Sequence, residues 1–229
     1  MKIALCFFGQ PRFVKKGYEY YKKNLIDNHD VDVFIHTWFS VDNMEKGFDS
    51  MHGFSAFTQK ENVMDIINTY KPKRILVEPE KEFKVPEHSK PSGMTKPHII
   101  YSFQYSRTMS NSLKQQHEND NGFKYDWVFN TRFDFALNEQ FNFEEMPTDK
   151  VMIPMYDTFN DQCSFATSEV MDYACGVYEK LDDYVDEGIE FSGEGVWKRH
   201  IQEIVHEVDY NHPFGPNAYG SNRNSLIRG

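Results

Sequence analysis

The sequence predicts a single α/β domain, spanning residues 1–229, with a mostly parallel central sheet flanked by helices. Three observations lead to this fold class. Lys2–Phe8 is a continuous apolar run, which is typical of a strand buried on both faces of a parallel sheet. Apolar residues then recur every three or four positions over residues 14–25, the spacing of an amphipathic helix. A second buried run, at residues 32–36, completes a strand–helix–strand unit of the kind that builds doubly wound sheets.

The middle of the chain continues this alternation. A capping box at residues 58–61 predicts the start of a helix that runs to about Tyr70, and Arg74–Glu78 follows as a third strand. A proline-rich loop over residues 79–97 precedes a long helix, at about residues 98–118, with serines along one stripe.

The second half of the chain is predicted to return to the sheet. The most buried-looking strand covers residues 125–133, and residues 151–166 hold two further short strands around a polar loop. Ser168 and Ser192 are expected to cap two helices, and residues 207–210 to form a last strand.

Composition excludes several classes of protein. The net charge is −10 and no large cluster of Lys and Arg occurs, so we expect no nucleic-acid partner. No stretch approaches 18 apolar residues, and the start of the chain lacks the pattern of a signal peptide, so we expect no transmembrane segment. The three cysteines are odd in number and form no CxxC, which favours buried thiols in a reducing, cytoplasmic compartment.

Candidate ligand-binding residues follow the predicted strands. In an open α/β sheet, ligands bind outside the carboxyl ends of the strands. The residues expected at that edge are Gly9, Gln10 and Arg12 after the first strand, His36 and Trp38 after the second, and Arg132 and Asp134 after the central strand. Arg12 is a candidate partner for a diphosphate because its planar guanidinium can bind two oxygens at once.

Carboxylates suggest the remaining chemistry. Asp134 follows a buried strand, where a carboxylate can hold Mg²⁺ or Mn²⁺ between two phosphates. Glu194 lies between two glycines at a helix start, which suits a general base or an acceptor contact. Asp161 and Gln162 are candidates for contacts to sugar hydroxyls, with Asp161 a second catalytic candidate.

Other polar residues have weaker claims. Arg223 and Arg228, near the C-terminus, can also reach a phosphate, and His212 is a candidate late metal ligand, although a structural role is more common for a single His. Asp30 and Asp32 are spaced D-x-D, but they precede a strand, so we expect them in a solvated turn. The chain has no GxGxxG, no P-loop, no GxSxG and no zinc spacing.

An ordered set of motifs resembles a known family. The matching stretches are ALCFFGQPR, DVDVFIHTW, YDWVFNTRFDFAL, DQCSFATSEVMDYACGVYEKL and GEGVWKRHI, and they cover most of the chain. In this order they resemble the small GT-A-type glycosyltransferases of bacterial surface-polysaccharide clusters and of large viruses and phages.

The resemblance implies a GT-A-like (Rossmann-like) fold, a nucleotide-sugar donor, a saccharide acceptor, and Mn²⁺ or Mg²⁺. It assigns donor binding to the loop from Gly9 to Arg12, and the metal or diphosphate to Asp134. Asp161, Gln162 and Glu194 fall on the acceptor side. In this chain Arg132 replaces the first acid of the usual D-x-D, so Arg132 itself is expected to neutralise phosphate charge.

The sequence therefore predicts a glycosyltransferase of the bacterial or virus-infected host cytoplasm. Two other functions stay open. A nucleotidyltransferase that makes the activated sugar would use a related site, although the first strand lacks the Gly-rich, Lys-containing loop of such enzymes. A non-catalytic module that binds a nucleotide or carbohydrate would agree with the incomplete D-x-D.

Overall fold

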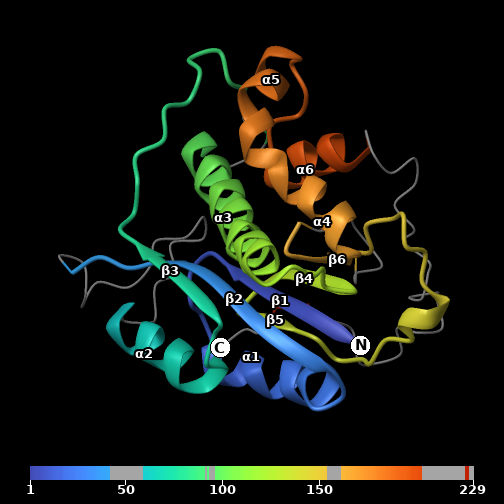
Figure 1. Ribbon diagram of the computed structural model, residues 1–229. Coiled ribbons are helices and arrows are strands. Elements are labelled where there is room, and N and C mark those ends of the chain that lie inside the picture. Colours follow the sequence, from blue (N-terminus) through green and yellow to red (C-terminus); the bar gives the residue numbers. More distant parts are fainter. Residues whose placement is uncertain (42–58, 91, 93–95, 154–160, 203–224, 227–229) are drawn as a thin grey trace.

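The computed structural model describes residues 1–41, 59–90, 92, 96–153, 161–202 and 225–226. It confirms an α/β fold in which helices flank both faces of a five-stranded, mostly parallel sheet (Figure 1). The strand order is β3-β2-β1-β4-β6. The first four strands in this order are parallel, and β6 at the edge runs antiparallel to β4. The strands are β1 (Lys2–Phe8), β2 (Asp30–Trp38), β3 (Arg74–Glu78), β4 (Trp127–Arg132) and β6 (Cys163–Ala166).

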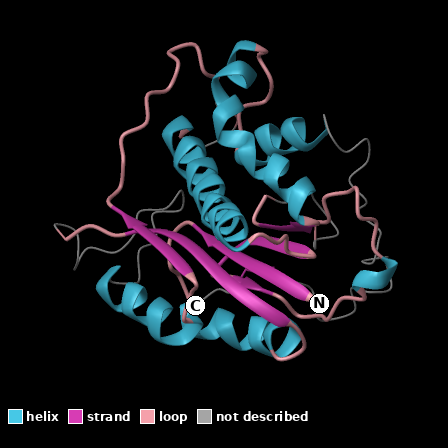
Figure 2. Cartoon of the chain, viewed as in Figure 1, coloured by secondary structure: helices cyan, strands magenta, loops and turns pink. Residues whose placement is uncertain are grey.

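Two layers of helices enclose the sheet (Figure 2). One face is covered by α1 (Val14–Tyr21), which continues as a π-helical turn (Lys22–Ile26), and by α2 (Gln59–Tyr70). The other face carries α3 (Pro97–Asn121), α4 (Ser168–Ala174), a 3-10 helix (Cys175–Lys180), α5 (Leu181–Asp186) and α6 (Gly193–Gln202). A further 3-10 turn lies at Phe143–Glu145, and β5 (Phe135–Ala136) pairs with β7 (Ser225–Leu226) in a small second sheet.

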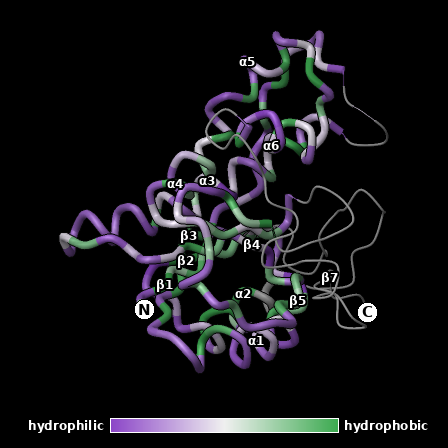
Figure 3. Tube along the Cα trace, turned by 90° about the vertical axis from the view of Figure 1, so that its right-hand side faces the viewer, coloured by the Kyte–Doolittle hydropathy of each residue, from purple (hydrophilic) through white to green (hydrophobic). Residues whose placement is uncertain are grey.

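The sheet is buried on both faces because its strands are apolar on both sides. In β1, Ile3, Leu5 and Phe7 pack toward α1 and α2, whereas Ala4 and Cys6 pack toward α3. This arrangement explains why β1 reads as a continuous apolar run and not as an alternating one. Figure 3 shows hydrophobic stretches along the strands between the helix layers.

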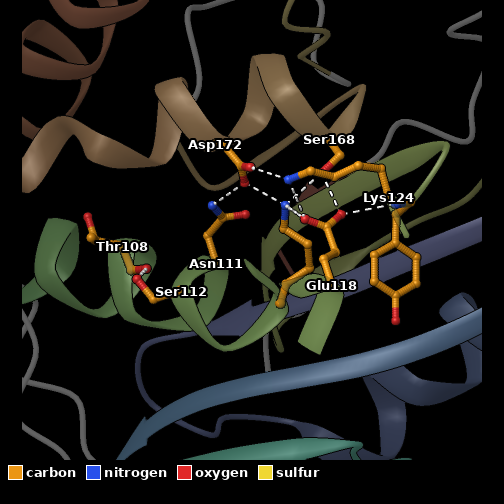
Figure 4. A network of polar contacts seen from close by, with 9 residues as sticks. Thr108, Asn111, Ser112, Glu118, Lys124, Ser168 and Asp172 are labelled. Atoms are coloured by element: carbon orange, nitrogen blue, oxygen red, sulfur yellow. Dashed lines mark hydrogen bonds and ion pairs between the residues drawn. The ribbon is translucent and has the colours of Figure 1, made fainter. Parts of the chain in front are cut away.

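A polar stripe runs along the buried face of α3. Its members recur at three- and four-residue spacing and are Gln104, Arg107, Asn111, Lys114 and Glu118. Near the end of α3, the buried Lys114 ammonium contacts Glu118 (3.1 Å), Asp172 (2.5 Å) and the Ser168 hydroxyl (2.7 Å). Figure 4 shows Glu118, Lys124, Ser168 and Asp172 gathered at this place. We call Lys114, Glu118, Lys124, Ser168 and Asp172 the closed network.

Most predicted elements are confirmed. β1 and β3 have the predicted bounds, β2 extends the predicted strand in both directions, and α3 covers the predicted long helix. In the region of residues 151–166, β6 forms one strand, and Met152 contributes only an isolated bridge to Phe165. The Ser192 hydroxyl accepts the Gly195 N–H (2.9 Å), as expected of a helix cap.

Two sequence predictions are wrong. Ser168 is the first residue of α4 and not its cap, because its hydroxyl donates to Glu118 (2.6 Å) while Thr167 takes the cap position. Asp32 is not in a solvated turn: it is buried in β2 and accepts the Tyr125 hydroxyl (2.7 Å). Thr58 of the capping box and the predicted strand at residues 207–210 lie outside the described residues.

All three cysteines are free and buried, as expected. Within the part of the chain that the structure describes, no helix combines the length and the apolar character needed to cross a membrane.

Candidate functional site

The order in which the chain adds strands to the sheet reverses between β1 and β4. From β1 the chain proceeds to β2 on one side and reaches β4 on the other only after β3 and α3. Such a switch point leaves a crevice where loops diverge, and ligands of open α/β sheets bind there. Gly9, Gln10 and Arg12 leave β1 at this point, and Arg132 and Asp134 leave β4 beside it.

The turn after β1 has a fixed shape. Gly9 has a φ of +87°, a conformation that favours glycine. Its N–H donates to the Ser106 hydroxyl (2.7 Å), and its carbonyl accepts the Thr37 hydroxyl (2.8 Å). The Arg12 guanidinium donates a hydrogen bond to the Gln10 side-chain carbonyl. The two residues, both predicted to bind the nucleotide-sugar donor, are therefore in contact with each other.

Arg132 and Asp134 form an ion pair with two parallel hydrogen bonds. Arg132 Nε lies 2.9 Å from one carboxylate oxygen and Nη2 lies 2.6 Å from the other. Asp134 is only 4% exposed. Burial alone would lower the pKa of Arg132, but Asp134 outweighs that effect and raises it.

This ion pair bears on the expected metal. Both oxygens of Asp134 are engaged by Arg132, and among the described residues no group of three His, Cys, Asp or Glu side chains could hold a metal ion. In this arrangement the residues around Asp134 do not fit a cation. The metal role of Asp134 stays a prediction, and it requires Arg132 to release the carboxylate.

Two guanidinium groups, those of Arg12 and Arg132, lie near each other at this edge. Burial and the neighbouring Arg132 lower the pKa of Arg12, while Asp134 opposes them. Both guanidinium groups lie within electrostatic range of Asp134, and Arg132 also lies within range of Asp161. Guanidinium groups bind anions such as a phosphate, so this pair is the candidate phosphate contact in a chain whose net charge is −10.

His36 and Trp38 lie inside the molecule. The His36 ring is fully buried, with Nδ1 2.7 Å from the Ser106 hydroxyl and Nε2 2.9 Å from a Glu78 oxygen. Trp38 is 3% exposed and stacks on Tyr105, with ring centroids 5.7 Å apart. The structure thus places both residues as supports behind the turn at Gly9 and not at the surface.

The acceptor-side candidates lie next to the donor-side ones. The Gln162 carbonyl accepts the Arg132 N–H (3.1 Å), which joins the segment before β6 to the end of β4. Asp161 lies against the first turn of α6, and a Cβ on Gly193 would clash with its carboxylate. Glycine at this position therefore brings Asp161 close to Glu194.

Both carboxylates are easier to protonate than usual. Burial raises the pKa of Asp161, against the opposing charges of Arg107 and Arg132. Burial also raises the pKa of Glu194, and the nearby Asp161 and Glu190 raise it further. Glu194 is exposed at the start of α6, so a substrate can reach it. A reachable carboxylate with a raised pKa suits proton transfer near neutral pH.

Sequence reasoning missed Arg107. A fully buried arginine is rare, and charged residues are normally expected at the surface. The signal was the polar stripe of α3: its residues have the spacing of a core-facing stripe but are not apolar. Three predicted residues, His212, Arg223 and Arg228, lie outside the described residues.

Comparison with known proteins gives a family without an activity. A family model described as a domain of unknown function, DUF7796, matches residues 1–211. No curated protein matches the chain.

Proposed function

Since the chain belongs to the DUF7796 family, whose description names no activity, we propose its function from the site: a glycosyltransferase that moves a sugar from a nucleotide-sugar donor to a saccharide hydroxyl. One observation carries the proposal. A pair of guanidinium groups, Arg12 and Arg132, lies at the switch point of the sheet, and Arg132 lies within electrostatic range of Asp161, a carboxylate with a raised pKa. We also propose that the α/β fold is of the GT-A type and that the reaction takes place in the cytoplasm.

The donor diphosphate would lie against Arg12 and Arg132. A guanidinium can bind two phosphate oxygens and offset the charge that grows on the leaving nucleotide as the glycosidic bond breaks. The Arg132–Asp134 pair supports this assignment because the carboxylate orients the guanidinium through two hydrogen bonds.

The acceptor would lie toward α6. Glu194 is the proposed general base, which takes the proton of the attacking hydroxyl if the enzyme inverts the anomeric centre. Its exposure and raised pKa support this role. Asp161 and Gln162 would orient the acceptor beside it.

A divalent ion is the least supported part of the proposal. Mn²⁺ or Mg²⁺, if bound, would be held by Asp134 and would supply positive charge to the diphosphate. Because Arg132 already occupies both Asp134 oxygens, we assign phosphate neutralisation to the two arginines and derive no step through a metal.

Thermal shifts with UDP, GDP, CMP and dTDP, each with and without Mn²⁺, test the donor site. A nucleotide at 100 times its dissociation constant adds about 2.7 kcal/mol to the free energy of unfolding. For a domain of this size the melting temperature should rise by about 5–10 °C. An equal rise with and without Mn²⁺ supports Arg132 as the phosphate partner, whereas a rise only with Mn²⁺ assigns that role to Asp134 and a cation.

Arg132→Gln is the matching variant. Arg74→Gln is its control, because Arg74 begins β3 at the opposite end of the parallel strands and pairs with Asp120. The nucleotide shift should disappear in Arg132→Gln and persist in the control. No shift of the wild-type protein with any nucleotide would count against a transferase.

A second candidate function is a nucleotide-binding module without turnover. The observation that favours it is the same Arg132–Asp134 pair, which leaves no carboxylate free for a metal at the end of β4. Nucleotide binding without sugar transfer or donor hydrolysis, over a panel of nucleotide sugars and acceptors, would select this function.

A further inference from the structure

Arg107 connects four parts of the molecule through one buried guanidinium. It lies on α3, and its Nε donates to the Asn130 side-chain carbonyl on β4 (3.2 Å). Nη1 donates to Gln104 of α3 (2.9 Å), and Nη2 donates to the main-chain carbonyl of Asp161. The three nitrogens thus bind in three directions, which fixes the orientation of the group.

The flat faces of this guanidinium are also in contact. Its central carbon lies 4.0 Å from the ring centroid of Trp197 and 4.9 Å from that of Phe8. Cation–π contacts of this kind are stronger when they are shielded from water. Trp197 lies on α6, one turn after Glu194, so Arg107 also holds the beginning of the helix that carries the proposed base.

The charge of Arg107 acts on Asp161. Burial lowers the pKa of Arg107 to about 10, so the group stays charged at neutral pH. Asp161 exerts the largest opposing electrostatic effect on Arg107, and Arg107 in turn limits how far burial raises the pKa of Asp161. Without that charge, Asp161 would take up a proton at a higher pH.

Gly193 completes the arrangement. A carboxylate oxygen of Asp161 lies too close to residue 193, at the first turn of α6, to leave room for a Cβ there. One side of Asp161 is therefore limited by α6 and the other by Arg107, so the distance between Asp161 and Glu194 is fixed by packing.

We infer that Arg107 is the positioning residue of this site: it holds Asp161 between the end of β4 and the start of α6, at a fixed place relative to Glu194. The inference rests on the proposed function for the role of the two carboxylates. Arg107 itself touches no substrate, since it is fully buried.

Two variants of Arg107 separate its charge from its shape. Arg107→Met removes the charge, so the pKa of Asp161 should rise by about 1–3 pH units. Carboxyl-carbon NMR measures this titration, and the Asp161→Asn variant assigns the signal. In Arg107→Met, kcat should fall about 100-fold, the cost of a small misplacement, while the KM for the donor changes little. Arg107→Lys keeps the charge but loses the planar fork, so it should restore the pKa of Asp161 and not kcat.

Arg199→Met is the matched control. Arg199 also lies over an aromatic ring, that of Tyr184, and pairs with a carboxylate, that of Glu187. Neither Tyr184 nor Glu187 takes part in the contacts of Arg107 and Asp161 described above. This variant should leave the pKa of Asp161 and kcat unchanged. A folded Arg107→Met protein with a normal kcat and a normal Asp161 titration overturns the inference.

Gly193→Ala tests the same arrangement if Arg107→Met does not fold. The added Cβ must displace the Asp161 carboxylate while Arg107 stays intact. We expect a similar fall in kcat, and an unchanged kcat overturns the inference. If the wild-type protein transfers no sugar, the proposed function fails, but the Asp161 titration in the Arg107 variants still decides whether Arg107 controls this carboxylate.

Discussion

The two ends of the polar stripe on α3 differ in how their charges are satisfied. At the C-terminal end, the Glu118 carboxylate accepts hydrogen bonds from Lys114, Lys124, the Ser168 hydroxyl and the Tyr125 N–H. Burial alone would raise the pKa of Glu118, but these donors outweigh it and lower the pKa. Nearer the N-terminal end, Asp161 and Glu194 have raised pKa values beside Arg107 and Arg132.

This difference teaches that a cluster of buried charges is not in itself a functional site. The closed network neutralises its own carboxylates, as a structural ion-pair network does. At the carboxyl edge of the sheet, carboxylates are held in places that make them harder to ionise. A carboxylate that is harder to ionise lowers the stability of the fold at neutral pH, and perturbed pKa values of this kind cluster at functional sites.

At the carboxyl edge of the sheet, Glu194→Gln should have the largest effect on the rate of sugar transfer. Loss of a general base lowers the rate by about 10²–10⁴-fold, and the amide keeps the size of the side chain. The measurement is kcat for sugar transfer, with Glu187→Gln as a control on the neighbouring surface. Nearly normal kcat in Glu194→Gln would remove Glu194 from the mechanism and leave Asp161 as the candidate base.

In the closed network, Lys114→Met should have the largest effect on the free energy of unfolding. Removing Lys114 takes one cation from Glu118 and Asp172 and leaves Lys124 as their remaining basic partner, and loss of one partner of a buried ion pair costs about 3–5 kcal/mol. Chemical denaturation should show this loss of unfolding free energy, while kcat of the folded protein stays normal. A loss below about 1 kcal/mol would mean that the closed network behaves like a surface ion pair.

The same change, Glu to Gln, should alter stability with opposite signs at the two ends. Glu118 has a lowered pKa, so its contribution is present above the pKa of an unfolded Glu and is lost as pH falls through the folded value. Glu118→Gln should therefore cost about 1.5–3 kcal/mol at pH 7, and the cost should shrink in acid.

Glu194 has a raised pKa, so it disfavours folding at pH values above that pKa. Glu194→Gln should increase the unfolding free energy at pH 7 by a few tenths of a kcal/mol, since the group is exposed. The gain should disappear once the pH falls below the pKa of an unfolded Glu. Melting temperatures of both variants at pH 4 and pH 7 measure the two signs, and equal signs would contradict the comparison.

The sequence predicted the sheet well because its strands are buried on both faces. β1 was predicted with its observed bounds because a continuous apolar run buried on both faces has few alternatives. β3, a half-buried strand at the edge of the sheet, was also predicted with its observed bounds. The rule that ligands bind outside the carboxyl ends of the strands also predicted that Arg12, Arg132 and Asp134 lie at the same edge. These predictions depend only on residues close together along the chain.

The missed features depend on contacts between distant segments. The predicted role of Ser168 was wrong because Glu118, 50 residues earlier, accepts the hydrogen bond of its hydroxyl. His36 was predicted to contact the donor at the carboxyl edge because its burial and its contacts with Ser106 and Glu78 are not visible in a local pattern. Arg107 was missed for the same reason, since Asn130 and Asp161 come from later in the chain.

The peptide group of Gly9 is held on both sides, by Ser106 and by Thr37, without any ligand. Ordering a residue of the backbone costs about 1–2 kcal/mol of conformational entropy, and here that cost falls on folding and not on binding. We therefore expect the observed association rate of a nucleotide to rise linearly with its concentration in stopped-flow experiments. A plateau would reveal a slow rearrangement of this turn, whereas a straight line would mean that diffusion and local charge set how fast the edge captures its ligand.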